Sequence, residues 1–254
     1  MAKHTCAICG AEIGVLAAQK LADGNYICRK NCRSKLFKVF DCVPATLQEV
    51  KDHIAQIEYG TKVWNQIFVP LKKTKNKEEK LRQIHGPKEC LVYVSPSTGL
   101  IAFNENRYKF MFFGKTEYAC VYRVADLVTY EYESETKKNS EGKDETKHYC
   151  WFGFQNTAGL SYFRVEMASK HEYDSLEKYF NELFGIQKTL RNSLNNARRQ
   201  VNAIKSAAST IKAIKDGTID EAQVSDTFDA LNAIDLGDRT EWIAKADAAL
   251  AQVK

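Results

Sequence analysis

Four of the eight cysteines stand between Cys6 and Cys32, as the two close pairs Cys6-x2-Cys9 and Cys28-x3-Cys32. A CxxC turn lets two thiolates converge on one ion, and a second pair at this distance completes the tetrahedral S4 shell that structural Zn²⁺ prefers. The sequence therefore predicts a structural zinc ion held by these four cysteines. Because four protein ligands leave no open coordination position, we expect no catalytic role for the ion.

A redox dithiol is the main alternative for these cysteines. A thioredoxin-type CxxC belongs to a strand–helix unit of an α/β domain, and no such unit surrounds Cys6. His4 and Cys42 were weighed as substitute ligands and are expected to be bystanders. Cys90, Cys120 and Cys150 stand in apolar runs, where a free cysteine behaves as a small buried hydrophobe.

The residues around the pairs indicate the elements that would position them. Apolar Ile13, Leu16 and Leu21 lie between the pairs, and Asp23-Gly24 is a turn signal. The stretch "ICRKNCRSKLFKVF" predicts a short strand that leads into a helix, with Cys32 in its first turn, where the helix dipole favours a thiolate. A knuckle, a hairpin and a helix make a treble-clef or zinc-ribbon layout.

The pattern C-x2-CG-x2-IG-x-L…KL-x-DG…IC-x3-C-x2-KL resembles a small zinc-binding family of bacterial proteins known as a domain of unknown function. The matching residues lie between Cys6 and Leu36 of this chain, and the resemblance as a whole covers about 45 residues. The resemblance implies a structural zinc module at the N-terminus of a larger protein. It does not imply any particular activity. Members are often followed by a pleckstrin-homology-like (PH-like) β-domain, which sets an expectation for the middle of the chain.

A helix is predicted directly after the zinc module. "TLQE" at 46–49 is a capping box, in which Thr46 caps and Glu49 reaches back, and Leu47, Val50, Ile54 and Ile57 form a helical stripe over about 47–59. The following residues give no clear pattern. Lys72, Lys73, Lys75 and Lys77 form a basic run, which we interpret as a solvated loop or, alternatively, a phosphate-contacting patch.

From Cys90 the chain becomes rich in short aromatic and β-branched runs, which predict strands. The runs are "CLVYV", "LIAF", "YKFMFF", "YACVYR", "LVTYEYE", "HYCWFGF" and "LSYFRVE". The polar stretch 133–147 is expected to be an exposed hairpin loop. Ser169 and Glu172 form a second capping box before an amphipathic helix that should end at Gly185. About seven antiparallel strands closed by one helix are the plan of a PH-like barrel; another small barrel or an α+β sandwich is the alternative.

The C-terminal part is predicted to be helical and is divided by charge. A heptad seam runs from Leu190 to Ile211 and could pack within or between chains. Residues 186–215 hold seven basic and no acidic residues, whereas 216–254 hold nine acidic and three basic residues. We expect the two later helices, from Thr218 and from Asp238, to fold back onto the basic one. The alternative is that the basic helix binds an acidic protein, an anionic membrane surface or nucleic acid.

Composition excludes several classes of protein. A hydrophobic fraction of 44% is that of a folded chain, and no window predicts a membrane-spanning helix. The N-terminus has no apolar signal region, so we expect a cytoplasmic protein with reduced thiols. The family resemblance implies a bacterial or phage origin. Phosphate-binding and hydrolase motifs are absent, and neither His148 nor His171 has a nucleophile or carboxylate at catalytic spacing. An enzyme is therefore the least favoured class.

These observations predict an α+β multidomain protein. Its expected parts are a zinc-binding module (1–42), a helix and connecting segment (43–89), a PH-like β-domain (90–185) and a helical hairpin or three-helix segment (186–254). The favoured function is a zinc-stabilised, non-enzymatic adaptor for a protein partner. The alternative is a nucleic-acid-binding protein, because residues 1–40 carry seven basic and two acidic residues, about +3 once the zinc–thiolate centre is counted. The candidate anion contacts are Arg29, Lys30, Arg33, Lys72, Lys73, Lys75, Arg191, Arg198 and Arg199.

Overall fold

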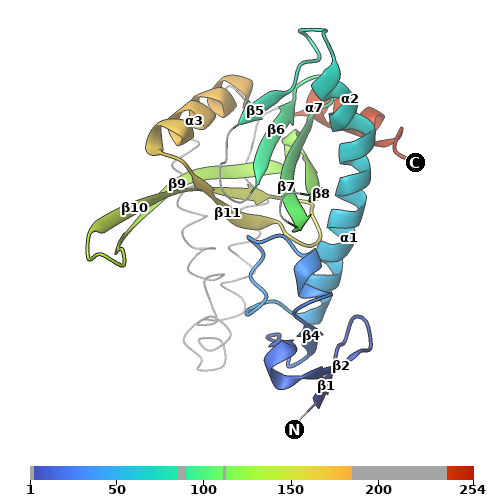
Figure 1. Cartoon of the computed structure of the whole chain (residues 1–254). Coiled ribbons are helices and arrows are strands. Elements are labelled where there is room, and N and C mark those ends of the chain that lie inside the picture. The colour runs from blue at the N-terminus through green and yellow to red at the C-terminus, as the bar shows by residue number, and fades with distance from the viewer. Residues whose placement is uncertain (1–2, 85–89, 111–112, 185–238) are drawn as a thin grey trace, which may run out of the picture.

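The computed structural model describes residues 3–84, 90–110, 113–184 and 239–254. The chain is α+β, as expected, with a small N-terminal module, two antiparallel sheets and three main helices (Figure 1). The heptad seam, the helix expected from Thr218 and the basic residues Arg191, Arg198 and Arg199 lie outside the described residues. In the part of the chain that the structure describes, no helix is long and apolar enough to cross a membrane.

The N-terminal module consists of two small hairpins and little else. Strands β1 (Lys3–Thr5) and β2 (Glu12–Gly14) form one pair, and β3 (Ala18–Lys20) and β4 (Tyr26–Cys28) form the other. The 3₁₀ turn η1 (Val15–Ala17) joins the pairs, and η2 (Arg33–Lys35) follows Cys32. The expected helix after Cys32 was wrong: Cys32 caps a single 3₁₀ turn, which ends when Leu36 takes an extended conformation.

Helix α1 (Leu47–Val63) begins with the predicted capping box, because the Thr46 side chain accepts from the Glu49 N–H and the Glu49 carboxylate accepts from the Thr46 N–H. It is longer than predicted and continues through the π-helical turn η3 (Trp64–Phe68) into α2 (Val69–Lys73). Pro70 lacks an N–H to donate within a helix, and the widened turn directly before it accommodates this loss. The segment that gave no sequence pattern is therefore helical.

The first sheet has the order β5-β6-β7-β8 and the second has the order β11-β10-β9; both are antiparallel and open. The strands of the first are β5 (Arg82–Ile84), β6 (Leu91–Ser95), β7 (Leu100–Phe110) and β8 (Phe113–Arg123). The short turn η4 (Val124–Asp126) leads into β9 (Leu127–Lys138), followed by β10 (Asp144–Phe154) and β11 (Tyr162–Met167).

Two strand predictions need correction. "YKFMFF" is not a separate strand, because its described residues, 108–110 and Phe113, belong to the ends of β7 and β8, which pair as one long hairpin. The polar stretch 133–147 is not mainly a loop, since β9 and β10 pair through it from Glu133↔Tyr149 to Lys138↔Asp144. Only the turn at 139–143 remains, where the Asn139 side chain accepts from the N–H groups of Glu141 and Lys143. Cross-strand pairing overrode the polar composition.

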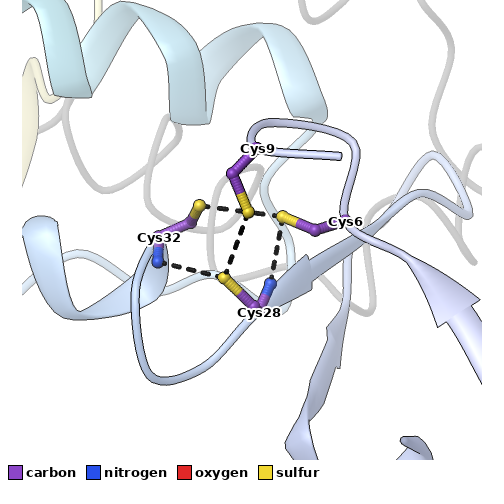
Figure 2. Close-up of side chains that lie close together, drawn as sticks. All are labelled: Cys6, Cys9, Cys28 and Cys32. Carbon is purple, nitrogen blue, oxygen red and sulfur yellow. Dashed lines mark hydrogen bonds between the residues drawn. The ribbon is translucent and has the colours of Figure 1, made fainter. Parts of the chain in front are cut away.

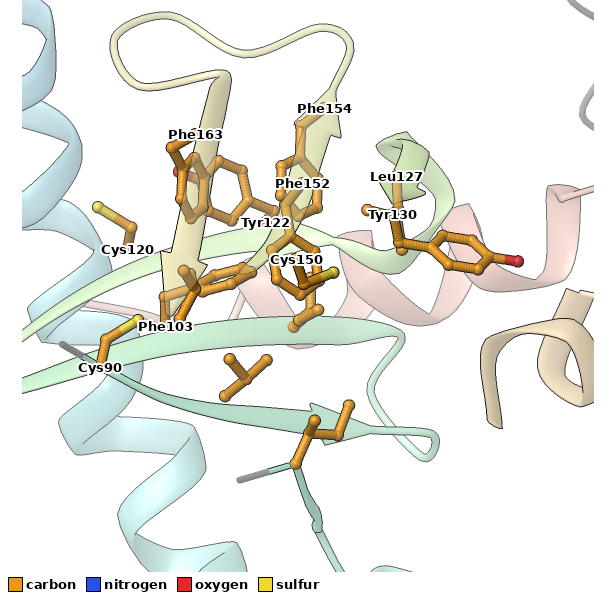
Figure 3. Packing of buried hydrophobic residues seen from close by; sticks show 14 of the residues in the cluster. Cys90, Phe103, Cys120, Tyr122, Leu127, Tyr130, Cys150, Phe152, Phe154 and Phe163 are labelled. Carbon is orange, nitrogen blue, oxygen red and sulfur yellow. The ribbon is translucent and has the colours of Figure 1, made fainter. Parts of the chain in front are cut away.

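The main core lies between the two sheets and beneath helix α3 (Lys170–Phe184), which buries Tyr173, Leu176 and Phe180 against it. Phe103 packs edge-on against the rings of Tyr122, Phe152 and Phe163 (Figure 3). The isolated cysteines Cys90, Cys120 and Cys150 are buried in this core, as predicted.

A second apolar layer covers the outer face of the first sheet. Helix α1 crosses β8 so closely that a Cβ at Gly60 would lie 2.3 Å from the Ala119 carbonyl oxygen. The last helix, α7 (Thr240–Leu250), buries Ala246 and Ala249 in the same layer as Trp64, Phe68, Tyr93 and Leu100. The expected C-terminal helix therefore exists, and it packs on the sheet domain.

Candidate metal centre

The two short hairpins bring the four predicted cysteines to one point (Figure 2). The Sγ atoms of Cys6, Cys9, Cys28 and Cys32 all lie within 4.8 Å of one another. The Cys6–Cys32 and Cys9–Cys28 Sγ pairs are each 3.7 Å apart. Zinc–sulfur bonds of about 2.3 Å require tetrahedral S–S edges of about 3.8 Å, so these distances fit a single bound ion.

Backbone N–H groups point at the sulfur atoms and favour the thiolate form. The Cys28 N–H donates to Cys6 Sγ and the Cys32 N–H donates to Cys28 Sγ, both over 3.3 Å. Burial raises the pKa of Cys6, but backbone N–H groups of Cys9, Cys28 and Ile8 outweigh burial and lower the pKa to about 6. The pKa of Cys32 is raised by burial and by the neighbouring sulfurs, which is the repulsion that a cation would relieve.

The residues between the ligands explain how so small a unit folds. Gly10 has a φ of +73°, a backbone conformation that closes the first CxxC turn. Ile13, Leu21 and Ile27 are buried around the cysteines with Leu36 and Val50. Cys9 is the only exposed member of the cluster. His4 stacks on Tyr26, and Cys42 is buried outside the cluster, so neither is brought to the metal centre.

One residue of the module departs from what its type suggests. Leu16, apolar like Ile13 and Leu21, is 91% exposed at the tip of η1, beside Val15 at 54%. The burial of Ile13 and Leu21 follows from their place on the inner face of the hairpins. No pattern in the sequence indicates that Leu16 points away from them.

Asp23 attaches the module to α1. Its carboxylate accepts from the Leu47 N–H at 2.8 Å and from the Asn25 N–H at 3.2 Å. The Leu47 N–H is the first cause of the lowered pKa of Asp23. The turn predicted at Asp23-Gly24 is thus confirmed, and Asp23 also satisfies an N–H at the beginning of the helix.

A polar junction joins the module to the sheet domain, which sequence patterns did not indicate. Glu105 of β7 is only 1% exposed; it accepts from the Lys38 N–H at 3.1 Å and pairs with Arg107 Nε at 2.7 Å. Arg107 also donates to the carbonyl oxygens of Ser34 and Leu36. The chain that follows Cys32 is therefore fixed to β7.

His53 forms the second part of this junction. Its Nε2 accepts from the Phe37 N–H, so Nδ1 carries the proton and donates to Gln56 Oε1 at 2.9 Å. Gln56 in turn exchanges hydrogen bonds with the backbone of Leu160. Burial is the main cause that lowers the pKa of His53, to about 4. A buried neutral histidine thus connects the module, α1 and the β10–β11 loop.

The candidate anion contacts within the described residues fall into two groups. Arg29, Lys30 and Arg33 are exposed on the metal module. Lys72 and Lys73 end α2 and Lys75 follows it, and all three are exposed. Lys72 Nζ also lies over the rings of Trp64 and Tyr93, at 5.2 and 4.8 Å. The two groups lie on separate elements. His148 contacts the Tyr132 hydroxyl, which gives it a packing partner within the sheet.

A pocket that the sequence did not indicate lies between β5 and the beginning of α3. It has a volume of about 380 Å³ and is lined by Arg82, Gln83, Ser169, His171, Ser175 and Tyr179, among others. Arg82 lies over the Tyr179 ring at 5.3 Å. The pocket adjoins β5, a strand that pairs with β6 at the edge of its sheet.

Comparison with known proteins gives one match. A family model described as a domain of unknown function (DUF4428) covers residues 5–53, which include all four clustered cysteines and end within α1. This agrees with the resemblance seen in residues 6–36 and does not reach the sheets. Curated proteins and solved structures gave no match.

Proposed function

We propose that this protein is a zinc-stabilised, non-enzymatic binding protein whose β-domain holds a partner at the pocket between β5 and α3. The metal is Zn²⁺, since four sulfur ligands at tetrahedral spacing suit this ion and leave no position for substrate. Its role is to stabilise a unit whose own apolar core is too small to fold alone.

A PH-like arrangement of the β-domain fits this proposal. The strand order supports it, because four antiparallel strands precede three, and α3 follows and covers the core between them. The domain divisions at 42 and 185 remain part of the same proposal, but the β-domain begins before residue 89, because β5 pairs with β6. The β10–β11 loop and α1 both contact the chain segment that connects the metal module to the sheets. The module therefore fixes the position of the β-domain and need not itself contact the partner.

The observation that carries the binding role is the pocket beside an edge strand. Among the described residues β5 is the terminal strand of its sheet, and an extended peptide that lies in the pocket would run beside it. The Tyr179 hydroxyl is buried and has no hydrogen-bond partner among the described residues, so a peptide carbonyl or N–H could satisfy it. The buried, apolar side chain of Leu176 also lines this pocket.

A photo-crosslinking amino acid placed at Gln83 tests this proposal in cells. The same group placed at Tyr59, an exposed residue of α1, is the matched control. We expect one partner to crosslink through Gln83 and not through Tyr59, and to be lost when Tyr179→Ala removes the ring beneath Arg82. Equal crosslinking from both positions would contradict the proposal.

Nucleic-acid binding is the second candidate, favoured by the exposed cations Arg29, Lys30 and Arg33 on one module. Binding of labelled duplex DNA and single-stranded RNA at about 50 and 200 mM salt tests it. Micromolar binding that collapses with salt would support phosphate contacts, and the absence of binding at low salt would remove this candidate.

A further inference from the structure

The 3₁₀ turn η1 forms a tip in which four consecutive residues are exposed and none has a polar side chain. These are Gly14, Val15, Leu16 and Ala17, and Leu16 is 91% exposed. An isolated exposed leucine is ordinary, but an entirely apolar turn between two hairpins is unusual for a surface that faces only water. The metal module that carries the tip lies at the N-terminal end of α1, beyond the sheets (Figure 1).

Cations surround the base of this tip. The Arg29 N–H donates to the Ala17 carbonyl at 2.9 Å, and Arg29 Nε donates to the Ala18 carbonyl at 3.1 Å. Arg33 reaches Gln19 on the adjoining strand, at 3.4 Å. Lys20 and Lys30 are exposed next to these residues in the chain. The arginines are therefore fixed beside the apolar residues by the fold.

The carboxylates of residues 3–40 already have partners. Glu12 forms an ion pair with Lys3 at 2.8 Å, and Asp23 accepts from the N–H groups of Leu47 and Asn25. The four thiolates are balanced in part by the proposed zinc ion. The surface at η1 thus presents an apolar tip with the cations Arg29 and Arg33 beside its base.

We propose that η1 inserts into the surface of a membrane rich in anionic lipids, with the surrounding cations on the headgroups. A convex tip of four residues is far smaller than the roughly 800 Å² per partner of a stable protein interface. A bilayer needs no complementary shape, and stable attachment there requires an apolar insertion together with a basic patch. A phosphate backbone would use the cations and leave Leu16 without a favourable contact.

Cosedimentation of the full zinc-loaded chain with vesicles tests this inference. The vesicles contain phosphatidylcholine alone or with about 30% phosphatidylglycerol, at about 50 and 200 mM salt. We expect binding to the anionic vesicles that weakens with salt. Leu16→Ser should reduce the partition coefficient by about tenfold or more, and Lys30→Glu by about tenfold.

Matched controls separate the tip from the rest of the surface. Val43→Ser removes an apolar side chain that is 57% exposed on another loop, and Lys51→Glu reverses an exposed charge on α1; both should bind as the unaltered chain does. A Leu16→Trp variant should bind and show indole quenching by brominated lipid beyond that of the native tryptophans. Zinc content confirms that each variant is folded.

Three results would overturn the inference. The first is no binding to anionic vesicles at low salt, and the second is binding that Leu16→Ser leaves unchanged. The third is that duplex DNA binds instead of vesicles, with Lys30→Glu harmful and Leu16→Ser neutral, which would assign the cations to nucleic acid. None of these depends on the pocket between β5 and α3.

Discussion

The metal module and the sheet domain are stabilised by different means. The module has small hairpins, one 3₁₀ turn after its last cysteine and a limited set of buried aliphatic residues around four thiols. The sheet domain buries a continuous cluster that includes Phe103, Phe152, Phe163 and Phe180. On the proposal that the four cysteines bind zinc, metal coordination would take the place of an apolar core where the chain is too short to form one.

The largest expected effect comes from Cys28→Ser, which should remove the metal and unfold residues 3–35 while the sheets stay folded. Metal-binding free energies of about 10–16 kcal/mol in zinc-finger peptides show how much such a unit depends on its ion. Zinc analysis and amide hydrogen exchange measure the outcome. Cys42→Ala, a buried cysteine outside the cluster, should keep its zinc. A Cys28→Ser protein with ordered β1–β4 would refute the structural role.

Phe103→Ala disrupts the core of the sheet domain instead of the metal module. Removing a buried ring that contacts Tyr122, Phe152 and Phe163 should lower the free energy of unfolding by about 3–5 kcal/mol. Urea denaturation measures this, and Phe103→Leu should cost less because it leaves a smaller cavity. The folded variant should retain its full zinc content. Zinc loss without unfolding of the sheets would show that the two regions are not stabilised separately.

Acid should weaken the junction between the two regions through His53. Its folded-state pKa of about 4 lies below the ordinary value near 6.5, so the unfolded chain binds more protons between these two values. The free energy of unfolding therefore falls as pH drops from about 6.5 to about 4, by at most about 3 kcal/mol. His53→Gln should flatten this part of the pH profile. If the free energies of unfolding of the two proteins depended on pH in the same way, His53 would not be the group responsible.

The smallest effect is expected at the outer ribbon of β9 and β10. Glu135 pairs with Lys137 and with Arg164 at 2.8 and 2.6 Å, and these partners lower its pKa to about 2. The carboxylate is partly solvated, so Glu135→Gln should cost less than about 1 kcal/mol, and less still in high salt. Thermal unfolding at two salt concentrations measures the difference. A cost like that of Phe103→Ala would mean that the ribbon belongs to the core.

Local features of the structure could be predicted from the sequence, whereas features that depend on contacts between distant residues could not. The ligand cysteines, the capping box at Thr46 and the helix from Lys170 were predictable because their signals lie within a few residues. The ribbon at 133–147 was not, since its polar residues become strands only by pairing across the turn. Glu105 and Arg107 lie in the polar residues between two expected strands, "LIAF" and "YKFMFF". Only the fold brings Arg107 to Ser34 and Leu36, and Glu105 to Lys38.

The proposed binding sites were harder to predict from the sequence than the metal centre. The pocket joins β5 to α3 across more than eighty residues of chain, and no short pattern records that contact. The exposure of Leu16 could not be predicted for a different reason. Its residue type suggests burial, and only the geometry of η1 turns it outward.

The contact between Phe184 and Arg239 has a consequence for the topology of the chain. The Arg239 guanidinium lies 4.1 Å from the centre of the Phe184 ring and donates to the carbonyl oxygens of Ala125 and Leu127. The two ends of the 54-residue interval 185–238 therefore meet at one place on the domain. In this respect the interval is an insertion between two neighbouring points. Replacement of residues 185–238 by a short glycine–serine linker should leave α7 docked, because Phe184 and Arg239 on either side are in contact.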